Sequence, residues 1–434
     1  GVRAIVGFGP SSVVRGSFPP DVADVSSSCL VGGGWFGYLG FGMGRQVERL
    51  PAPPPRPAVL PEAVFGWYES VFVLDEEGRW WFESLADDAI PPALADPGAG
   101  SWSLSAMGLH GGGADVHRAA VAECVERIAA GELFQANLCV RLDGAFVGDP
   151  ASAFAFACDR LQPAYGAYFG LDDDAAVLSF SPELFLRRTG RSVETAPIKG
   201  TAPRVDGHVA ARDALAASAK DAAEHVMIVD LMRNDLGRVA AYGSVSAEEV
   251  PDVEPHPGVW HLVSRVRATL RDGVGDEQLV RATFPPGSVT GAPKVQALKV
   301  ISALEGTERE VYTGAIGYVS PVAGLEMNVA IRTLEVRGSA AWLGCGGGIV
   351  ADSDPDAELR EALADARWLA DEDAVAFEEY RVLAAELRGT DRERVLRKAR
   401  TLHRQHAGWL VRLLTAVPAV FERALRGGWI RVGG

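Results

Sequence analysis

The chain has few cysteines, no long apolar run and fewer basic than acidic residues. Its five cysteines are scattered along 434 residues and form no C-x-x-C pair. This usage argues against a structural zinc site and a disulfide framework, and it favours reduced thiols in a cytoplasmic protein. No run of about 18 uncharged apolar residues occurs, so the sequence predicts no membrane span.

The charge balance restricts the classes of partner. Lysine and arginine number 42 against 57 aspartates and glutamates, a net charge of −15. Nucleic-acid binding requires a basic face, so nucleic acid is not expected as the main partner. An anionic small substrate would need locally placed cations or a metal. The length and a hydrophobic content of 48% are those of a globular protein of two or three domains.

One lysine lies in a conformationally restricted segment, Glu194–Arg204, which reads Glu-Thr-Ala-Pro-Ile-Lys-Gly-Thr-Ala-Pro-Arg. Pro197 limits the backbone before Lys199, and Gly200 permits a positive φ after it. A lone Lys-Gly pair is usually a solvent-exposed loop. A lysine held in a turn can instead serve as a nucleophile, provided that burial or a nearby cation keeps its amine neutral.

Several carboxylates have positions that suit chemistry as well as structure. Glu183 follows Ser-Pro between two apolar segments, where a glutamate is ordinarily structural but can stay protonated as an acid. Glu224 lies on the apolar stripe of a helical region, 209–236, and needs a cation there, either an arginine such as Arg233 or Mg²⁺.

A second pair of acids follows Pro355. Glu358 and Glu361 share one face of a predicted helix, where acids commonly interact with the helix dipole. Before that helix, Gly346, Gly347 and Gly348 follow a strand-like segment. We expect their backbone N–H groups to converge on an anion.

Single polar or charged residues also occur within three strand-like runs. Gln135 in 132–142 faces either solvent or a pocket, and His261 in 260–267 is most simply a core or rim residue. Arg332 lies in an apolar run, 326–334, and is expected to meet a carboxylate.

The loop 284–298 opens a predicted helix at Pro293 but lacks G-x-x-x-x-G-K-[ST], which excludes a nucleotide-binding P-loop.

Taken in order, these motifs resemble the chorismate-utilising enzymes over residues 1–370. Pro-Ile-Lys-Gly-Thr is similar to the signature of the aminodeoxychorismate synthase component I group, whereas the anthranilate synthase group has alanine at the position of Lys199. The resemblance implies an α+β fold with large, mostly antiparallel sheets packed together and flanked by helices. It divides the chain into a β-rich part (1–110), a catalytic part (111–370) and an arginine-rich helical extension of unknown role (371–434).

The resemblance also implies a reaction, the amination of chorismate at C4. Lys199 would add at C2, Glu183 would protonate the departing C4 hydroxyl, and Thr201 would position the incoming group. His261 belongs to the site in these enzymes. Residues that would contact the substrate are Gln135, Tyr312, Arg332, Gly346, Gly347 and Gly348. Mg²⁺ would be held by Glu224 and Glu361, with Glu358 close by.

No glutaminase-type motif surrounds any cysteine, so the ammonia is expected from a separate glutamine amidotransferase subunit. An anthranilate-type aminase is the alternative among enzymes. A non-catalytic chorismate- or tryptophan-binding subunit is the alternative from another class. It is favoured by Asp365, which stands where these enzymes usually carry a substrate-binding lysine, and a carboxylate there repels a dianion unless Arg367 or another cation compensates.

Overall fold

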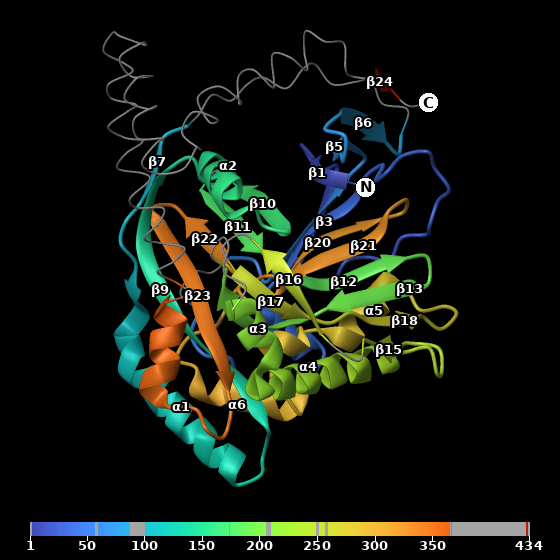
Figure 1. The fold of residues 1–434 in the computed structure, drawn as a ribbon. Helices are drawn as coiled ribbons and strands as arrows, with labels where there is room; N and C mark the ends of the chain where they lie inside the picture. Colours follow the sequence, from blue (N-terminus) through green and yellow to red (C-terminus); the bar gives the residue numbers. More distant parts are fainter. Residues whose placement is uncertain are drawn as a thin grey trace.

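The computed structural model describes residues 2–56, 60–86, 100–172, 174–204, 210–248, 251–256, 259–364, 366 and 431–432. Two large antiparallel sheets form its centre, and helices cover their outer faces (Figure 1). The predicted α+β class with large packed antiparallel sheets is therefore confirmed. Among the described helices, none combines the length and the apolar character that crossing a membrane requires.

The larger sheet has nine strands and draws on distant parts of the chain. In spatial order they are β15 (Ser246–Ala247), β18 (Val266–Thr269), β13 (Ser192–Ala196), β12 (Leu184–Thr189), β21 (Gly324–Val329), β20 (Ala315–Ser320), β3 (Gly34–Leu39), β4 (Ala63–Tyr68) and β2 (Ser12–Arg15). Strands from 1–110 and from 111–370 are thus hydrogen-bonded in one sheet. The proposed division at about residue 110 does not separate two sheets.

The second sheet has eight strands. Its path is β10 (Tyr165–Asp172), β11 (Ala175–Ser181), β22 (Thr333–Arg337), β23 (Ala340–Ile349), β9 (Gln135–Gly148) and β19 (Gly291–Ala292), and the short strands β7 (Trp102–Leu104) and β8 (Gly108–Leu109) also pair with β9. Tyr38 and Ile316 of the first sheet meet Val177 and Trp342 of the second in one buried cluster. The two sheets therefore pack face to face.

Two smaller sheets complete the β structure. A three-stranded sheet has the order β14 (Ile198–Pro203), β17 (Val259–Val263) and β16 (Asp252–His256). A four-stranded sheet has the order β1 (Val2–Val6), β5 (Ser70–Asp75), β6 (Trp80–Ser84) and β24 (Arg431–Val432).

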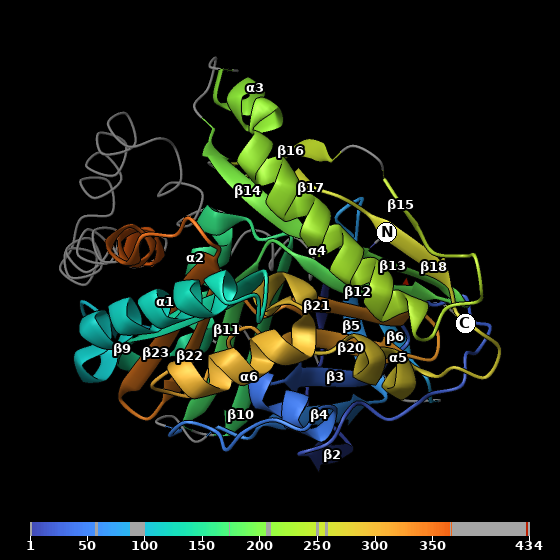
Figure 2. The same ribbon diagram turned by 90° about the horizontal axis from the view of Figure 1, so that it is seen from below.

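Some of the helices begin at residues whose side chains cap them. The helices are α1 (Gly113–Ala129), α2 (Pro150–Leu161), α3 (Ala210–Ala217), α4 (Ala219–Gly237), α5 (Asp276–Thr283), α6 (Lys294–Leu304) and a helix over 355–364. Asp149 accepts from the N–H of Ser152 at 2.9 Å and caps α2, and Ser218 accepts from the N–H of Asp221 at 3.2 Å and caps α4. Helices α1, α4, α5 and α6 are seen together from below in Figure 2.

Two runs predicted as continuous strands are broken, because the chain passes from one sheet to another inside each. The run 260–267 divides into β17 and β18, and 326–334 divides into β21 and β22. At the last break Arg332 has a φ of 51°, which is uncommon for a residue other than glycine. Arg332 therefore lies in a turn between the two large sheets, not in a strand as predicted.

Candidate active site

Lys199 lies in a bulged strand of the three-stranded sheet. It pairs with Leu262, Thr201 pairs with His261, and the register shifts between the two pairs at Gly200, whose φ is 80°. A Cβ at Gly200 would stand 3.0 Å from the Leu262 side chain, so the close packing also requires glycine. The segment is thus a strand with a β-bulge instead of a turn, although its positive φ was predicted correctly.

The Lys199 amine meets the eight-stranded sheet at Gly348. A Cβ built on Gly348 would lie 3.0 Å from Lys199 Nζ and 1.9 Å from Gln135 Nε2. Three residues far apart in the sequence therefore converge on one point. Gln135 is buried, and its Oε1 accepts no hydrogen bond from the part of the chain that the structure describes. This oxygen is an unsatisfied acceptor on a side chain whose amide meets the lysine amine at Gly348.

Glu183 is buried, and it lies close enough to Lys199 for the charge of the lysine to act on its carboxyl. Burial raises the pKa of its carboxyl to about 7, and a hydrogen bond from Ser288, the charge of Lys199 and the N–H of Ile198 oppose the rise. Its backbone is fixed, because the Glu183 carbonyl accepts from the Val329 N–H at 3.0 Å. A carboxyl of this kind is part protonated near neutrality, which is what a general acid requires.

Thr201 and His261 form a hydrogen-bonded pair next to the lysine. Thr201 Oγ1 lies 3.0 Å from His261 Nδ1. Burial, followed by the electrostatic effects of His256 and Arg332, lowers the pKa of His261 to about 3, so the imidazole is neutral at ordinary pH. The His256 ring packs edge-on against it at 4.8 Å between centroids. Sequence reasoning passed over His256, whose only signal was its position on a strand that precedes the His261 strand.

The glycine run lies in strand β23, so the predicted convergent cluster of N–H groups is wrong. The N–H of Asn137 donates to Thr290 at 2.7 Å, on the side of β9 away from β23. Asn137 is opposite Gly348, so this is a non-hydrogen-bonded pair and the Gly348 N–H points away from β9. Gly346 lies two residues earlier in the strand, so its N–H group also points away from β9. Strand β22 pairs with β23 only up to Leu343, so these N–H groups line an edge beyond β22.

Because the glycines of β23 carry no side chains, neighbouring groups approach this strand closely. A Cβ at Gly344 would lie 2.2 Å from the Tyr312 ring, and one at Gly347 would lie 3.3 Å from Glu358 Oε2. Tyr312 is buried, and Arg332 is close enough to His256 and His261 to lower their pKa values. Tyr312 thus contacts strand β23 at Gly344, and Arg332 lies near the histidine that pairs with Thr201.

The predicted metal carboxylates differ in exposure. Glu224 is half-buried on α4, Glu358 is half-buried with Oε1 accepting from Ser353 Oγ at 2.6 Å, and Glu361 is exposed one turn later. In the described residues no three or more histidine, cysteine or acidic side chains form a metal-binding group. One or two carboxylates nevertheless suit Mg²⁺, which prefers oxygen and keeps several non-protein ligands. Asp365 and Arg367 lie outside the described residues.

Two further buried residues of the site were missed. His225 Nε2 lies 2.8 Å from Ser264 Oγ, and burial, followed by the charge of Lys199, lowers its pKa to about 4. Ser264 N–H donates to Pro197, just before the lysine strand. The available signal was a histidine directly after Glu224, at the start of the apolar segment 226–229.

Lys294 belongs to the segment 284–298, which lacks the P-loop motif. It is buried and forms an ion pair with Asp235. Its Nζ also donates to the carbonyls of Thr283 at 2.7 Å and Pro285 at 2.8 Å. All three ammonium hydrogens are thereby engaged inside the protein. This lysine has a structural role, which agrees with the exclusion of nucleotide binding.

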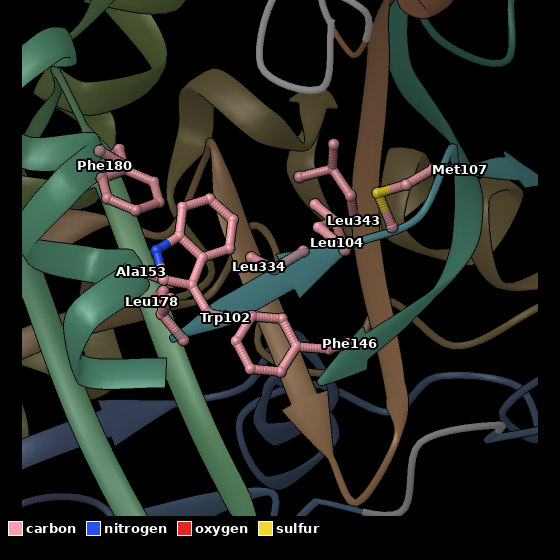
Figure 3. Close-up of a pocket in the computed structure, with 10 residues that line it drawn as sticks. Trp102, Leu104, Met107, Phe146, Ala153, Leu178, Phe180, Leu334 and Leu343 are labelled. Carbon is pink, nitrogen blue, oxygen red and sulfur yellow. The ribbon is translucent and has the colours of Figure 1, made fainter. Parts of the chain in front are cut away.

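A separate small cavity is lined by apolar side chains, including Trp102, Met107, Phe146 and Phe180 (Figure 3). It lies between α2 and the eight-stranded sheet. It contains none of the predicted site residues.

Comparison with known proteins identifies the family of the chain. The family described as chorismate binding enzyme matches residues 16–371. The chain belongs to this family of enzymes. It is 36% identical over 351 residues to aminodeoxychorismate synthase component 1 of Salmonella typhimurium, covering 76% of this chain and 74% of that protein.

The sister branch is also similar. Anthranilate synthase component 1 of Streptomyces coelicolor is 34% identical over 387 residues, covering 82% of this chain and 76% of that protein. The crystal structure of anthranilate synthase component I from Streptococcus pneumoniae superimposes with a TM-score of 0.74 at 25% identity, over 84% of this chain and 91% of that one. Overall similarity alone therefore separates the two branches only weakly.

Proposed function

We propose that this enzyme aminates chorismate at C4 to give 4-amino-4-deoxychorismate. The observation that supports it most directly is the position of Lys199, whose amine lies beside Gly348 and Gln135 and within the electrostatic reach of Glu183. The names of the similar component 1 proteins point to the same reaction.

The proposed chemistry divides between an acid and a nucleophile. Glu183 in its neutral form gives a proton to the C4 hydroxyl, which leaves as water. The neutral amine of Lys199 adds at C2 as the ring double bonds shift. Ammonia then adds at C4, the double bonds shift back, and the C2–N bond to Lys199 breaks. The Glu183 carboxylate can take up a proton released in this second step, which restores the acid.

The remaining residues orient the substrate. Gln135 cannot act as a base, so it would accept a hydrogen bond from an amine and would not activate water. Arg332 would bind a substrate carboxylate, and Thr201 with His261 would border the incoming group. The outward N–H groups of Gly346 and Gly348, together with Gly347, form the strand edge on which the ring would lie.

Glu224 and Glu361 would hold Mg²⁺, with Glu358 adjacent. A bound Mg²⁺ would offset the charge of the substrate ring carboxylate in a protein whose net charge is −15. For the ammonia we propose a separate glutamine amidotransferase subunit, because the relatives are named as first components. The product would serve p-aminobenzoate and folate synthesis.

Lys199 also argues against the sister activity, since the resemblance gives anthranilate synthases alanine there. The test is incubation of the protein with chorismate, Mg²⁺ and ammonium, with products resolved by mass. We expect aminodeoxychorismate, and its loss in Lys199→Ala. Anthranilate with pyruvate would reassign the protein to the sister branch. Chorismate binding without any turnover would favour the non-catalytic alternative.

A further inference from the structure

Tyr312 and Arg332 lie on two adjacent turns with unusual backbone conformations. Glu310 and Thr313, on either side of Tyr312, have φ values of 55° and 60°, and Arg332 has 51°. The turns are hydrogen-bonded together, since the Thr313 N–H donates to Ala330 at 2.8 Å. Positive φ at residues other than glycine persists only where surrounding contacts enforce it. Contacts around this pair of turns therefore hold both backbones in place.

One buried carboxyl links the two turns. Glu335 Oε1 accepts the N–H groups of Val311 and Tyr312, each at 3.2 Å. Glu335 belongs to β22, three residues after Arg332, and is only 2% exposed. The same short strand thus follows the arginine directly and fixes the backbone of the tyrosine.

The place of the Tyr312 ring depends on that backbone. The ring occupies the space that a side chain on Gly344 would fill, at 2.2 Å from the position of a Cβ. Buried side chains are packed too closely for the ring to move independently. A displacement of the Tyr312 backbone would therefore move the ring relative to strand β23 at Gly344.

The second oxygen of Glu335 faces a charged but incompletely paired interior. Glu335 Oε2, and Nε and Nη2 of the buried Arg141, have no hydrogen-bond partner among the residues that the structure describes. Arg141 stacks over Trp342 at 5.2 Å and donates from Nη1 to the Glu308 carbonyl at 3.4 Å. The other charged or titratable groups that act electrostatically with Glu335 are Glu310 and Tyr38.

We propose that Glu335 is a positioning residue that sets Tyr312 relative to Arg332 at the substrate edge of β23. This inference rests on the proposed function for the identity of the substrate, but its structural part can be tested independently. Burial raises the pKa of Glu335 to about 8, against the attraction of Arg141, so the carboxyl is mostly neutral at pH 7. A neutral acceptor of two N–H groups has a close mimic in glutamine.

The experiment compares Glu335→Leu, which loses the acceptor, with Glu335→Gln, which keeps it. We expect Glu335→Leu to raise KM for chorismate by about tenfold or more with a smaller change in kcat, and Glu335→Gln to recover most of the loss. A glutamine variant as impaired as the leucine variant would overturn the proposal.

Glu83 provides a matched control. It is likewise a buried glutamate that accepts backbone N–H groups, those of Leu30, Val31 and Gly32 at 2.7–2.9 Å, but in the four-stranded sheet. Glu83→Leu should lower stability and leave both kinetic constants of the folded enzyme unchanged. An equal rise of KM in this variant would reduce the effect of Glu335 to general destabilisation and contradict the inference.

Two further readouts separate this inference from the proposed function. In a cycle with Tyr312→Ala, Glu335→Leu should add less than about a twofold effect, since both changes act on the same ring. Additive losses would contradict positioning through Tyr312.

Amide hydrogen exchange provides the second readout, because it needs no turnover. Peptides covering 309–314 should exchange about tenfold faster or more in Glu335→Leu than in wild type or Glu335→Gln. Unchanged protection would overturn the proposal even in an active enzyme, whereas loss of protection without amination would refute only the proposed function.

Discussion

Lys199 and Gln135 share the space left open by Gly348. Their terminal nitrogens would be 3.0 and 1.9 Å from a Cβ at that position. Separations below 3 Å from a Cβ cannot be accommodated without movement. A methyl group there must displace the amide, the amine or the strand itself.

Gly348→Ala should therefore reduce kcat/KM by about 100-fold or more, because small misplacement of a nucleophile is costly. Gly108→Ala is the control, since a Cβ at Gly108 meets nothing within 4 Å and the residue lies in the same sheet. Steady-state kinetics on both variants provide the test. Equal activity of the two would show that the amine does not act from this position.

Glu183 should impose a pH limit on turnover. Its pKa is raised to about 7, so the acid form is present below that pH and disappears above it. We expect kcat of the wild type to fall as pH rises through about 7, and we call this decrease the alkaline limb. The kcat of Glu183→Gln should be lower by about 100- to 1,000-fold and should show no such limb. Ser288→Ala removes a hydrogen bond that lowers this pKa, so the limb should move to higher pH. A limb that stays in place in Glu183→Gln would assign it to another group.

The contribution of Glu335 to stability should decrease as pH rises, whereas that of a carboxylate in an ion pair increases with pH. Its pKa is raised from 4.5 to about 8, so between these values the folded protein keeps a proton that the unfolded chain has lost. The stabilising contribution is complete below about pH 4.5 and is lost progressively as pH approaches 8. The free energy of unfolding of wild type relative to Glu335→Gln should fall by a few kcal/mol over this range. Urea titrations at four or five pH values measure it, and a flat difference would contradict the neutral carboxyl.

The buried Lys294–Asp235 pair should contribute to stability and not to substrate binding. Asp235→Asn leaves an ammonium group inside the protein without its counterion, which should cost about 3–5 kcal/mol. Asp356→Asn removes the exposed partner of Arg118, 2.7 Å away, and should cost less than about 1 kcal/mol. Chemical denaturation compares the two. A raised KM for chorismate in the folded Asp235→Asn protein would speak against a purely structural role.

Metal dependence should distinguish the three glutamates. EDTA should abolish amination and Mg²⁺ should restore it. Glu224→Gln and Glu361→Gln should raise the Mg²⁺ concentration for half-maximal activity by about tenfold or more, because each removes a proposed ligand charge. Glu358→Gln should have a smaller effect, since its Oε1 already accepts from Ser353. Metal titrations of the three variants decide the order. A larger effect at Glu358 would exchange the roles of Glu358 and Glu361.

The resemblance of the motifs to a known family allowed the fold class to be predicted, and Pro293 and Pro355 indicated where two helices begin, because such residues act locally. The sequence did not allow prediction of where a strand leaves one sheet for another. Arg332 sits in an apolar run that looks continuous, and the break after β21 depends on partners more than 100 residues away, such as Ser179, which pairs with Thr333. Similarly, the glycines of β23 resembled an anion-binding loop. Their pairing with β9 and the packing of the Tyr312 ring against Gly344 depend on tertiary structure, which the local sequence does not reveal.

The order of the nine-stranded sheet also has a consequence for synthesis of the protein. Gly37 of β3 pairs with Gly317 of β20, 280 positions later in the chain. At about 5–20 residues per second, β3 is made roughly 14–56 s before its partner strand exists. During this time one edge of β3 lacks its final neighbour, so chaperones that shield strand edges should raise the yield of this enzyme more than that of a protein built from local hairpins.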